Sequence, residues 1–391
     1  MNNKKAAKRK NILLVFLLLG AIVIGHLITG YGYLFRGVYL SYFQGQSGPG
    51  INDAHLFYNN EIASPNSIKF VSSSKKNNIK LPEKELALLE KINTASFIVV
   101  KNDSLIFEKY WGEYTSSTAT NSFSAAKSLV SLLIGIAVEE GKIDSVDQPV
   151  AAFLEEFNAD GKSKITIRNL LTMSSGLSWK ESGKNPYSDN AKGYYGQYLR
   201  EHIKSLKVIQ DPGKIFNYKS GDTQILVYVL EKATDKTISD YMQEKIWSKI
   251  NAESTALWNL DRENGDEKGF CCFYATAKDY AKIGQLILNN GKWGSDQIIP
   301  IYYLQNALLP AQDILEKDGS INKRYGWQWW YATYNNQPIH YARGLLGQYI
   351  IVYPAKKLVI VRTGEKRKKV QKDGHPADLW DYLRLAELVS K

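Results

Sequence analysis

The longest uninterrupted apolar stretch lies close to the N-terminus. Residues 12–29 are broken only by glycines and His26, and five basic residues precede them. A helix of this length spans a hydrocarbon core of about 30 Å, whereas the apolar region of a signal peptide is usually about 7–15 residues long. An uncleaved transmembrane anchor over residues 11–30 is therefore favoured over a cleaved signal, with residues 1–10 as a basic cytoplasmic tail. The positive-inside rule then places the rest of the chain in the periplasm or the exterior.

Runs of β-branched and aromatic residues predict strands towards both ends of the remaining chain. Residues 96–100 and 104–111 are separated by Lys101-Asn102-Asp103, which predicts a hairpin. Further strand-like runs cover residues 325–331, 348–353 and 358–362, and a final helix is expected over 377–389.

The middle of the chain has a helical pattern instead. Apolar residues recur at helical spacing over 124–140, and Gly141 follows as a stop. Other helices are expected from residue 86 and over residues 150–157, 167–173, 223–233, 238–250 and 277–288. Strands at both ends around a helical middle predict an α/β (α+β) fold, in which an antiparallel sheet is flanked by helices. An all-α lobe is inserted at about 125–260.

Composition changes this picture only in places. Apolar residues make up 44% of the chain and charged residues 23%, as in an ordinary globular protein. The stretch 31–84 is rich in Gly, Ser, Asn and Lys and is expected to be an extended connector that packs on a domain of residues 85–391. Part of the net charge of +11 comes from the five basic residues of the N-terminal tail. A second basic cluster at 366–372 is expected to be a solvated turn. No nucleic-acid partner is therefore predicted.

The cysteine content is limited to two adjacent residues, Cys271 and Cys272. We expect two free, buried thiols in a strand, because free cysteine packs as a small hydrophobic residue and a bond between neighbours is strained. No His, Cys and Asp cluster has the spacing of metal ligands, so neither a metal nor an organic cofactor is predicted.

The candidate chemistry begins with Ser124 and Lys127, three residues apart at the start of the helix predicted over 124–140. This spacing puts both side chains on one helix face. A serine hydroxyl needs a base to become a nucleophile, and burial lowers the pKa of a lysine so that it can act as one. The free N–H of Ser124 is a candidate oxyanion donor. Alone, the pattern is more typical of a capping serine and a solvated lysine.

A second motif makes the pattern specific. Tyr218-Lys219-Ser220 follows a turn at 211–213 and precedes a helix. Together with residues 123–140 and 165–177 it resembles the penicillin-recognising serine hydrolases, in the class C β-lactamase-like branch with D-Ala-D-Ala carboxypeptidases, esterases and 6-aminohexanoate-dimer hydrolases. The resemblance runs from about residue 85 to the C-terminus. It implies that Ser124 is acylated and that Lys127 and Tyr218 share the proton transfers.

Two departures from the family pattern point to a subgroup. Ser220 stands where many members have Asn, a variant associated with esterases and amide hydrolases. The Lys-Thr-Gly element is absent, and the corresponding segment, residues 342–348, is similar to that of the 6-aminohexanoate hydrolases. Arg343 is either a replacement for the missing lysine charge or a surface arginine.

The same resemblance suggests further substrate-binding residues. By position, the N–H of Leu345 is the expected second oxyanion donor. Gly344 and Gly347 are expected where the substrate backbone approaches closely. The resemblance implies that a loop tyrosine acts on the leaving group, and Tyr187, Tyr194 and Tyr195 are the open alternatives, although packing is the commoner role of such residues. Tyr187 is the substrate-binding candidate among them.

The sequence therefore predicts a membrane-anchored serine hydrolase that cleaves an ester or amide bond of a small-molecule substrate through an acyl-enzyme on Ser124. A D-Ala-D-Ala carboxypeptidase or a β-lactamase is the alternative within enzymes, and the missing Lys-Thr-Gly disfavours it. A non-catalytic peptidoglycan-binding or β-lactam-binding sensor is the alternative outside enzymes, and the intact Ser-x-x-Lys and Tyr218 disfavour it.

Overall fold

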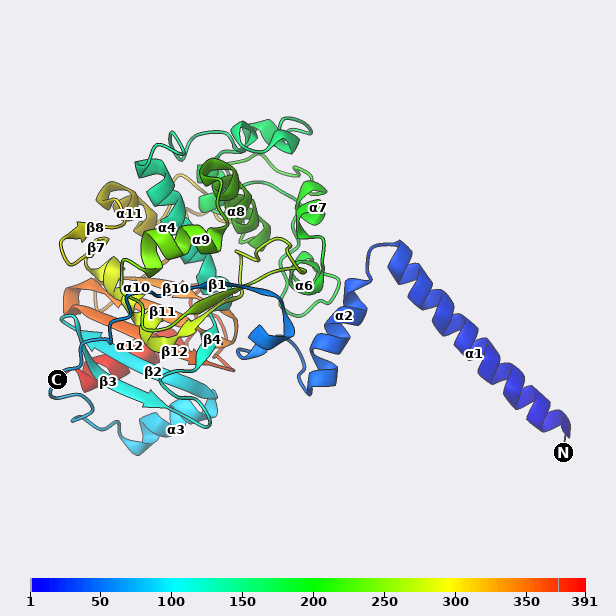
Figure 1. Cartoon of the computed structure of the whole chain (residues 1–391), viewed down its shortest axis with the longest axis horizontal. Coiled ribbons are helices and arrows are strands. Elements are labelled where there is room, and N and C mark those ends of the chain that lie inside the picture. Colours follow the sequence, from blue (N-terminus) through cyan, green and yellow to red (C-terminus); the bar gives the residue numbers. More distant parts are fainter. Residues whose placement is uncertain (1, 372) are drawn as a thin grey trace.

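The first helix stands apart from the rest of the molecule. The computed structural model describes residues 2–371 and 373–391 (Figure 1). Met1 of the predicted tail and Lys372 of the second basic cluster lie outside them. Helix α1 (Asn2–Ile28) projects away from the compact part of the chain. Its residues 9–28 are long and apolar enough to cross a membrane, although a signal sequence passes the same test of length and composition.

The central element is a six-stranded antiparallel sheet built from both chain ends, as predicted. Its order is β3-β2-β12-β11-β10-β9. The strands are β2 (Thr94–Lys101), β3 (Ser104–Tyr110), β9 (Trp330–Tyr334), β10 (Gln337–Arg343), β11 (Tyr349–Tyr353) and β12 (Leu358–Gly364). The hairpin between β2 and β3 turns at Asn102 and Asp103, whose φ angles of 48° and 61° suit a two-residue turn.

The prediction of a strand over residues 325–331 is wrong in its position, because the observed strand, β9, covers residues 330–334. Residues 325–329 turn into the core instead, and β9 begins only at Trp330. Gln328 has a φ of 65°, and its buried amide donates to the Leu170 carbonyl and accepts from Thr223. A buried side chain with these partners holds the segment as a loop rather than as a strand.

Helices cover both faces of the sheet. Along β2, Ile98 and Val100 belong to the core beneath α10 (Ala277–Leu288). Phe97 and Val99 point to the other face, beneath α12 (Asp378–Val389) and α3 (Glu83–Lys91). This alternation follows the two-residue period of a strand, here with both faces buried.

The middle of the chain is mostly helical, as expected, and several of its helices are shorter than predicted. Its helices are α4 (Ala126–Glu139), α5 (Ile167–Leu171), α6 (Asp189–Tyr195), α7 (Leu199–Lys204), α8 (Ser220–Thr234) and α9 (Ile238–Met242). The helix predicted over 150–157 is wrong: two 3₁₀ turns, Val150–Ala152 and Glu155–Phe157, occupy it. Pro149 precedes the first turn, and the Val150 N–H donates to the Ile165 carbonyl, which ties the segment to its neighbour. The helix predicted over 238–250 is α9 followed by a π-helical turn, Gln243–Trp247.

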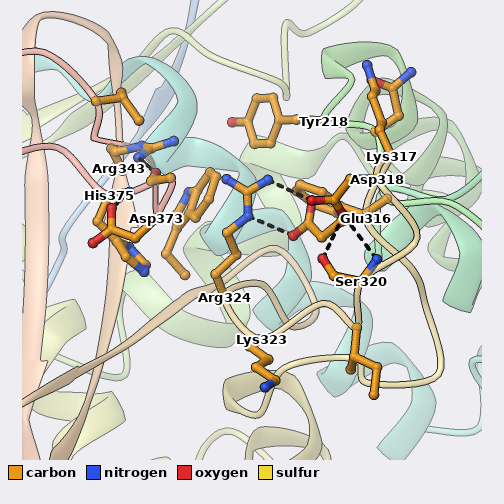
Figure 2. A pocket seen from close by; sticks show the side chains of 16 residues that line it. Tyr218, Glu316, Lys317, Asp318, Ser320, Lys323, Arg324, Arg343, Asp373 and His375 are labelled. Atoms are coloured by element: carbon orange, nitrogen blue, oxygen red, sulfur yellow. Dashed lines mark hydrogen bonds and ion pairs between the residues drawn. The ribbon is translucent and has the colours of Figure 1, made fainter.

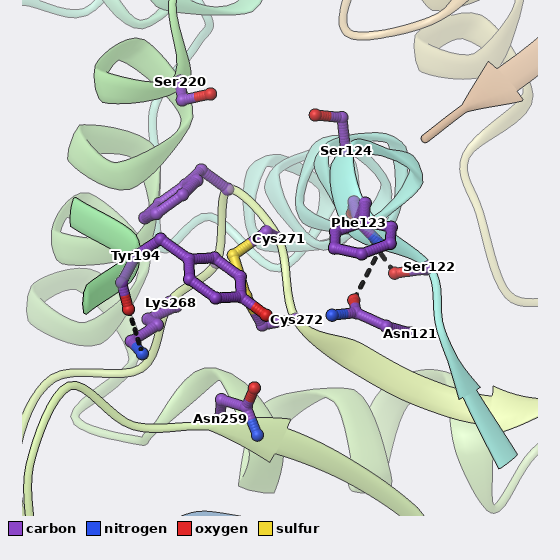
Figure 3. The surroundings of a disulfide bond; sticks show 12 residues. Asn121, Ser122, Phe123, Ser124, Tyr194, Ser220, Asn259, Lys268, Cys271 and Cys272 are labelled. Atoms are coloured by element: carbon purple, nitrogen blue, oxygen red, sulfur yellow. Dashed lines mark hydrogen bonds between the residues drawn. A yellow bond between two sulfur atoms is a disulfide. The ribbon is translucent and has the colours of Figure 1, made fainter. Parts of the chain in front are cut away.

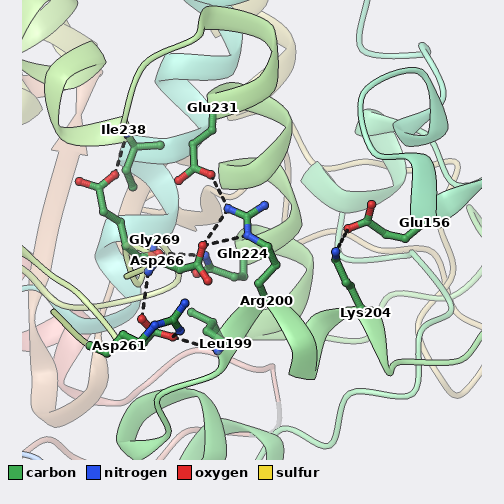
Figure 4. Close-up of polar contacts among 12 residues, drawn as sticks. Glu156, Leu199, Arg200, Lys204, Gln224, Glu231, Ile238, Asp261, Asp266 and Gly269 are labelled. Atoms are coloured by element: carbon green, nitrogen blue, oxygen red, sulfur yellow. Dashed lines mark hydrogen bonds and ion pairs between the residues drawn. The ribbon is translucent and has the colours of Figure 1, made fainter. Parts of the chain in front are cut away.

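Polar contacts with α7 and α8 hold the loop that follows β5 (Figure 4). Arg200 of α7 forms ion pairs with Glu231 of α8 at 2.8 Å and with Asp266 of the loop at 2.7 Å. Gln224 of α8 accepts a hydrogen bond from the Gly269 N–H at 3.0 Å. The loop thus presents the next residue, Phe270, at a defined place beside α4.

The stretch 31–84 contains ordered elements in addition to extended chain. Helix α2 (Tyr33–Leu40) packs against α6, and β1 (Asn59–Ile62) pairs with β5 (Ala256–Asn259). Strand β1 is part of a second sheet, β1-β5-β6-β4, with β4 (Ala119–Asn121) and β6 (Phe273–Thr276). The hairpin of β7 (Lys292–Trp293) and β8 (Asp296–Gln297) follows α10 and contacts it, and helix α11 (Ile301–Leu308) packs against α4. Strands this short carry too few residues for an alternating pattern, which is why the second sheet was not predicted.

Candidate active site

Ser124 lies in a tight 3₁₀ turn, Phe123–Ala125, that leads directly into α4 (Figure 3). Phe123 has a φ of 45°, which is uncommon for a residue other than glycine. Its N–H donates to the Asn121 side-chain oxygen at 2.8 Å, and its ring is buried. Such a conformation persists because its surroundings hold it, and it leaves the Ser124 hydroxyl partly exposed.

Lys127 is the partner of Ser124. Its Nζ lies 2.9 Å from the Ser124 Oγ and donates to the Phe270 carbonyl at 2.7 Å. The side chain is only 1% exposed. Burial lowers the pKa of Lys127 to about 8, against the opposing effect of the nearby Glu181 carboxylate. A large fraction of the lysine is therefore neutral near pH 8 and able to accept the serine proton.

Tyr218 joins this pair from the segment before α8. The Lys127 Nζ lies 5.2 Å from the centre of its ring, which stacks on Trp330. Burial raises the pKa of Tyr218, and Glu181 adds to the effect, while the Ser124 hydroxyl and two arginines act in the opposite direction. The phenol therefore carries its proton at neutral pH and can donate it. The structure thus brings Ser124, Lys127 and Tyr218 together.

The end of β10 packs against the Ser124 turn, and Gly344 and Leu345 directly follow this strand. A Cβ added to Gly344 would overlap the Ser122 carbonyl oxygen, and one added to Gly347 would overlap the Arg362 guanidinium. Each glycine therefore allows one part of the chain to approach another. That the substrate backbone also approaches them stays a prediction. The close contact at Gly344 lets the residues after β10 lie against the turn that carries Ser124. The role of the Leu345 N–H as second oxyanion donor stays a prediction.

Two residues that sequence reasoning missed hold the turn Leu345–Gly347. The guanidinium of Arg362, which is completely buried, donates to the carbonyls of Leu346 and Gly347 at 3.0 and 2.8 Å. The Gln348 amide donates to the Leu345 carbonyl at 3.0 Å. An oxyanion donor on this turn is consequently preorganised.

Glu181 is a third residue that sequence reasoning missed, and it organises Ser220. Its carboxylate accepts hydrogen bonds from the Ser220 N–H at 2.7 Å and hydroxyl at 2.9 Å. It also accepts from the Trp179 indole and the Asn190 amide, both at 2.7 Å. A single glutamate in a loop forms no recognisable motif, so the sequence carried no signal for it.

The loop tyrosines occupy different places. Tyr187 is 52% exposed, and its hydroxyl lies 3.2 Å from His26 Nε2 at the end of α1. Tyr194 is buried against Phe57, and Tyr195 packs on Gly37 of α2. Among the described hydrogen bonds, none links these three tyrosines to Ser124.

The two cysteines depart from the expectation of free thiols in a strand. Cys271 and Cys272 are joined by a disulfide just before β6 (Figure 3). The chain turns at Cys272, which has a φ of 68°, and this brings the neighbouring sulfur atoms to one side. The bonded pair directly follows Phe270, whose carbonyl accepts the Lys127 hydrogen bond.

Comparison with known proteins agrees with this geometry. A sequence model of the Beta-lactamase family matches residues 83–380, and the chain belongs to this family of serine hydrolases. The 6-aminohexanoate-dimer hydrolase of Paenarthrobacter ureafaciens is 23% identical over 304 residues, which are 72% of this chain and 75% of that protein. The resemblance inferred from the motifs is thereby confirmed.

Solved structures show the same fold. The structure named "Putative 6-aminohexanoate-dimer hydrolase from Bacillus anthracis" has a TM-score of 0.73 at 23% identity and covers 91% of this chain and 94% of its own. A family VIII carboxylesterase has a TM-score of 0.63 at 16% identity, with 82% and 98% covered. At such identities the structural likeness establishes the fold alone.

Proposed function

We propose that the chain is a membrane-anchored serine hydrolase that cleaves an ester or amide bond through an acyl-enzyme on Ser124. The observation that carries this proposal is the 2.9 Å contact between the Lys127 Nζ and the Ser124 Oγ. The buried lysine, with its pKa near 8, supplies the base that a serine nucleophile needs. Relatives named as a dimer hydrolase and a carboxylesterase support an amide or ester substrate.

The reaction follows from the position of each group. The Ser124 Oγ bonds to the substrate carbonyl carbon while neutral Lys127 takes the hydroxyl proton. The N–H groups of Ser124 and Leu345 stabilise the oxyanion. Tyr218 gives its proton to the leaving alcohol or amine as the bond between the carbonyl carbon and the leaving oxygen or nitrogen breaks, and Lys127 returns a proton to the phenol. Water then replaces the leaving group, repeats the proton transfers in reverse and releases the acid.

The anchor is supported by α1. The apolar window within its residues 9–28 is not buried against the rest of the molecule, and basic residues stand at its N-terminal side. By the positive-inside rule, an inserted α1 leaves the catalytic domain on the outer side of the cytoplasmic membrane.

A fluorophosphonate probe tests the nucleophile directly. We expect a covalent adduct on the peptide that contains Ser124, found by mass spectrometry of the folded full chain. Ser124→Ala should give no adduct, while Ser122→Ala, which removes the neighbouring hydroxyl, should still be labelled. Failure of every acylating probe on folded wild type would refute the proposal. Turnover of a nitrophenyl ester without release of D-alanine from a D-Ala-D-Ala peptide would separate an esterase from a carboxypeptidase.

A cavity beside Tyr218 supports a substrate with a negative charge (Figure 2). Its volume is about 790 Å³, and Tyr218, Trp330 and Arg343 line it. The Arg343 guanidinium lies 3.7 Å from the centre of the Trp330 ring and donates to the Gly374 carbonyl at 3.1 Å. Among the described residues, no carboxylate forms an ion pair with Arg343, whereas the neighbouring Arg324 is paired with Glu316 at 2.7 Å. The Arg343 charge is thus free to bind an anionic group of the substrate.

Arg343→Met is expected to raise KM about ten-fold for esters that carry a carboxylate, as the loss of one charged hydrogen bond of about 1.5 kcal/mol implies. Neutral esters of the same size should be hydrolysed as before. Lys323→Met, which removes another positive charge from the cavity wall, is the matched control. Equal effects of Arg343→Met on charged and neutral esters would argue against an anion site.

A further inference from the structure

One side of the site is bordered by the overhang segment, residues 180–196, which includes α6. Near its start, Glu181 holds both polar groups of Ser220. A Cβ added at Gly183 would lie 3.9 Å from the Leu345 side chain, so the segment also faces the turn at the end of β10. Asn190 of α6 joins these parts, because its amide donates to Glu181 at 2.7 Å and to the Ser220 hydroxyl at 3.2 Å.

The outer side of the overhang segment rests on α2, which lies next to α6 in Figure 1. One guanidinium nitrogen of Arg36 donates to the carbonyls of Tyr195, Gly196 and Asp261 at 3.0, 3.2 and 3.0 Å. The Tyr33 hydroxyl donates to the Pro186 carbonyl at 2.9 Å.

The contact between the two helices is close as well as polar. A Cβ added at Gly37 would lie 3.2 Å from the Tyr195 ring, so α2 and α6 meet without a side chain between them. Tyr33, Gly37 and Leu40 form the buried face of α2. Residues 33–40 lie outside the part of the chain that the family model matches.

These contacts give α2 a role beyond connecting α1 to the domain. Carbonyls at a helix end have no partner within the helix, and the half-buried Arg36 guanidinium donates to two of them, those of Tyr195 and Gly196. Arg36 therefore fixes the end of α6, while Tyr33 fixes the loop before it. Glu181 and Asn190 lie in the same segment, so their positions depend on both contacts.

We propose that α2 is a positioning element of the active site, which holds the overhang segment, and with it Glu181, against Ser220 and Lys127. Arg36 is the principal positioning residue. The inference rests on the proposed reaction at Ser124, because it assigns α2 an effect on that reaction. It does not require that α1 spans a membrane.

The surroundings of Lys127 supply a readout that a merely structural role would not change. Glu181 is the charged group that acts on Lys127, whose Nζ also contacts the Ser124 hydroxyl, the Phe270 carbonyl and the rings of Phe270 and Tyr218. The Glu181 carboxylate raises the pKa of Lys127, so displacement of Glu181 lowers it. Because the base acts when neutral, the acid limb of kcat/KM then moves to lower pH.

The test uses the full chain in detergent micelles with a nitrophenyl ester. Arg36→Gln is expected to lower kcat/KM about ten-fold at pH 8 and to move the acid limb below its wild-type midpoint, in the same direction as Glu181→Gln. Arg36→Lys should restore most of the activity, since an ammonium can also donate to these carbonyls. Arg384→Gln breaks the ion pair between Arg384 of α12 and Glu85 of α3, far from Ser124 in the sequence. It is the control for a general loss of stability and should leave the midpoint of the acid limb unchanged.

Hydrogen exchange gives a second measurement that does not depend on activity. Peptides from residues 180–196 should exchange faster in Arg36→Gln than in wild type, and peptides from β11 and β12 should not. A wild-type midpoint together with wild-type exchange in Arg36→Gln would overturn the proposal, as would faster exchange throughout the domain without a shift of the midpoint. Failure of the proposed function is distinct, because wild type would then show no adduct on Ser124.

Discussion

Lys127→Met is expected to lower kcat/KM by roughly a thousand-fold at pH 8, because a general base contributes about 10²–10⁴ to the rate. Methionine retains the apolar part of the side chain and fills the same space between Ser124 and Phe270. It removes the only group seen to donate to the Ser124 Oγ among the described hydrogen bonds. The wild-type pH profile should rise through an acid limb near 8, the pKa of Lys127, and the variant should lack this limb.

The measurement is the pH dependence of ester hydrolysis together with the rate of fluorophosphonate labelling. Lys162→Met is the matched control, because Lys162 is also buried and donates to a main-chain carbonyl, that of Lys204, at 2.8 Å. The double variant Lys127→Met/Ser124→Ala should have a kcat/KM little lower than that of either single variant, since a nucleophile and its base act as a unit. Retention of more than a tenth of wild-type activity by Lys127→Met would exclude the lysine as the base.

Tyr218→Phe is expected to lower kcat/KM about a hundred-fold for amide substrates and much less for nitrophenyl esters. The phenol is assigned to protonate the leaving group, which an amine requires and a nitrophenolate does not. Phenylalanine keeps the ring that stacks on Trp330 and packs edge-on to Tyr325, so the loss reports on the hydroxyl. The comparison of an anilide with a nitrophenyl ester of the same acid measures the difference.

Tyr325→Phe is the control for this prediction. Tyr325 is buried next to Tyr218, and its ring packs against the same Trp330. Its hydroxyl has no part in the proposed reaction, so both substrates should be turned over at similar rates. Equal losses on both substrates in Tyr218→Phe would assign the hydroxyl to activation of Ser124 rather than to the leaving group.

The parts of the fold that could be predicted are those with long, regular patterns. Helix α10 begins and ends where its apolar period and the Asn289-Asn290-Gly291 stop place it. The hairpin of β2 and β3 turns at the two residues that favour positive φ. The short strands of the second sheet depend on partners far away in the sequence, and no local pattern indicates them.

The candidate site divides along the same line. Ser124, Lys127 and Tyr218 belong to motifs whose residue types and spacing indicate the chemistry. The groups that hold these three residues in place belong to no such motif. Arg362 and Gln348 act on a turn that becomes visible only when β10, β11 and β12 are assembled, and Glu181 acts on Ser220 from 39 positions earlier in the chain.

The pairing of β2 with β12 has a consequence for how the molecule is made. Residues 94–101 leave the ribosome more than 250 positions before residues 358–364, yet the two strands are neighbours in the finished sheet. Until then the apolar β2 has β3 beside it and an open edge on the other side, which is a state prone to aggregation. The open edge of β2 must therefore be shielded until residues 358–364 have emerged, and premature termination before residue 358 would leave a product without a closed core.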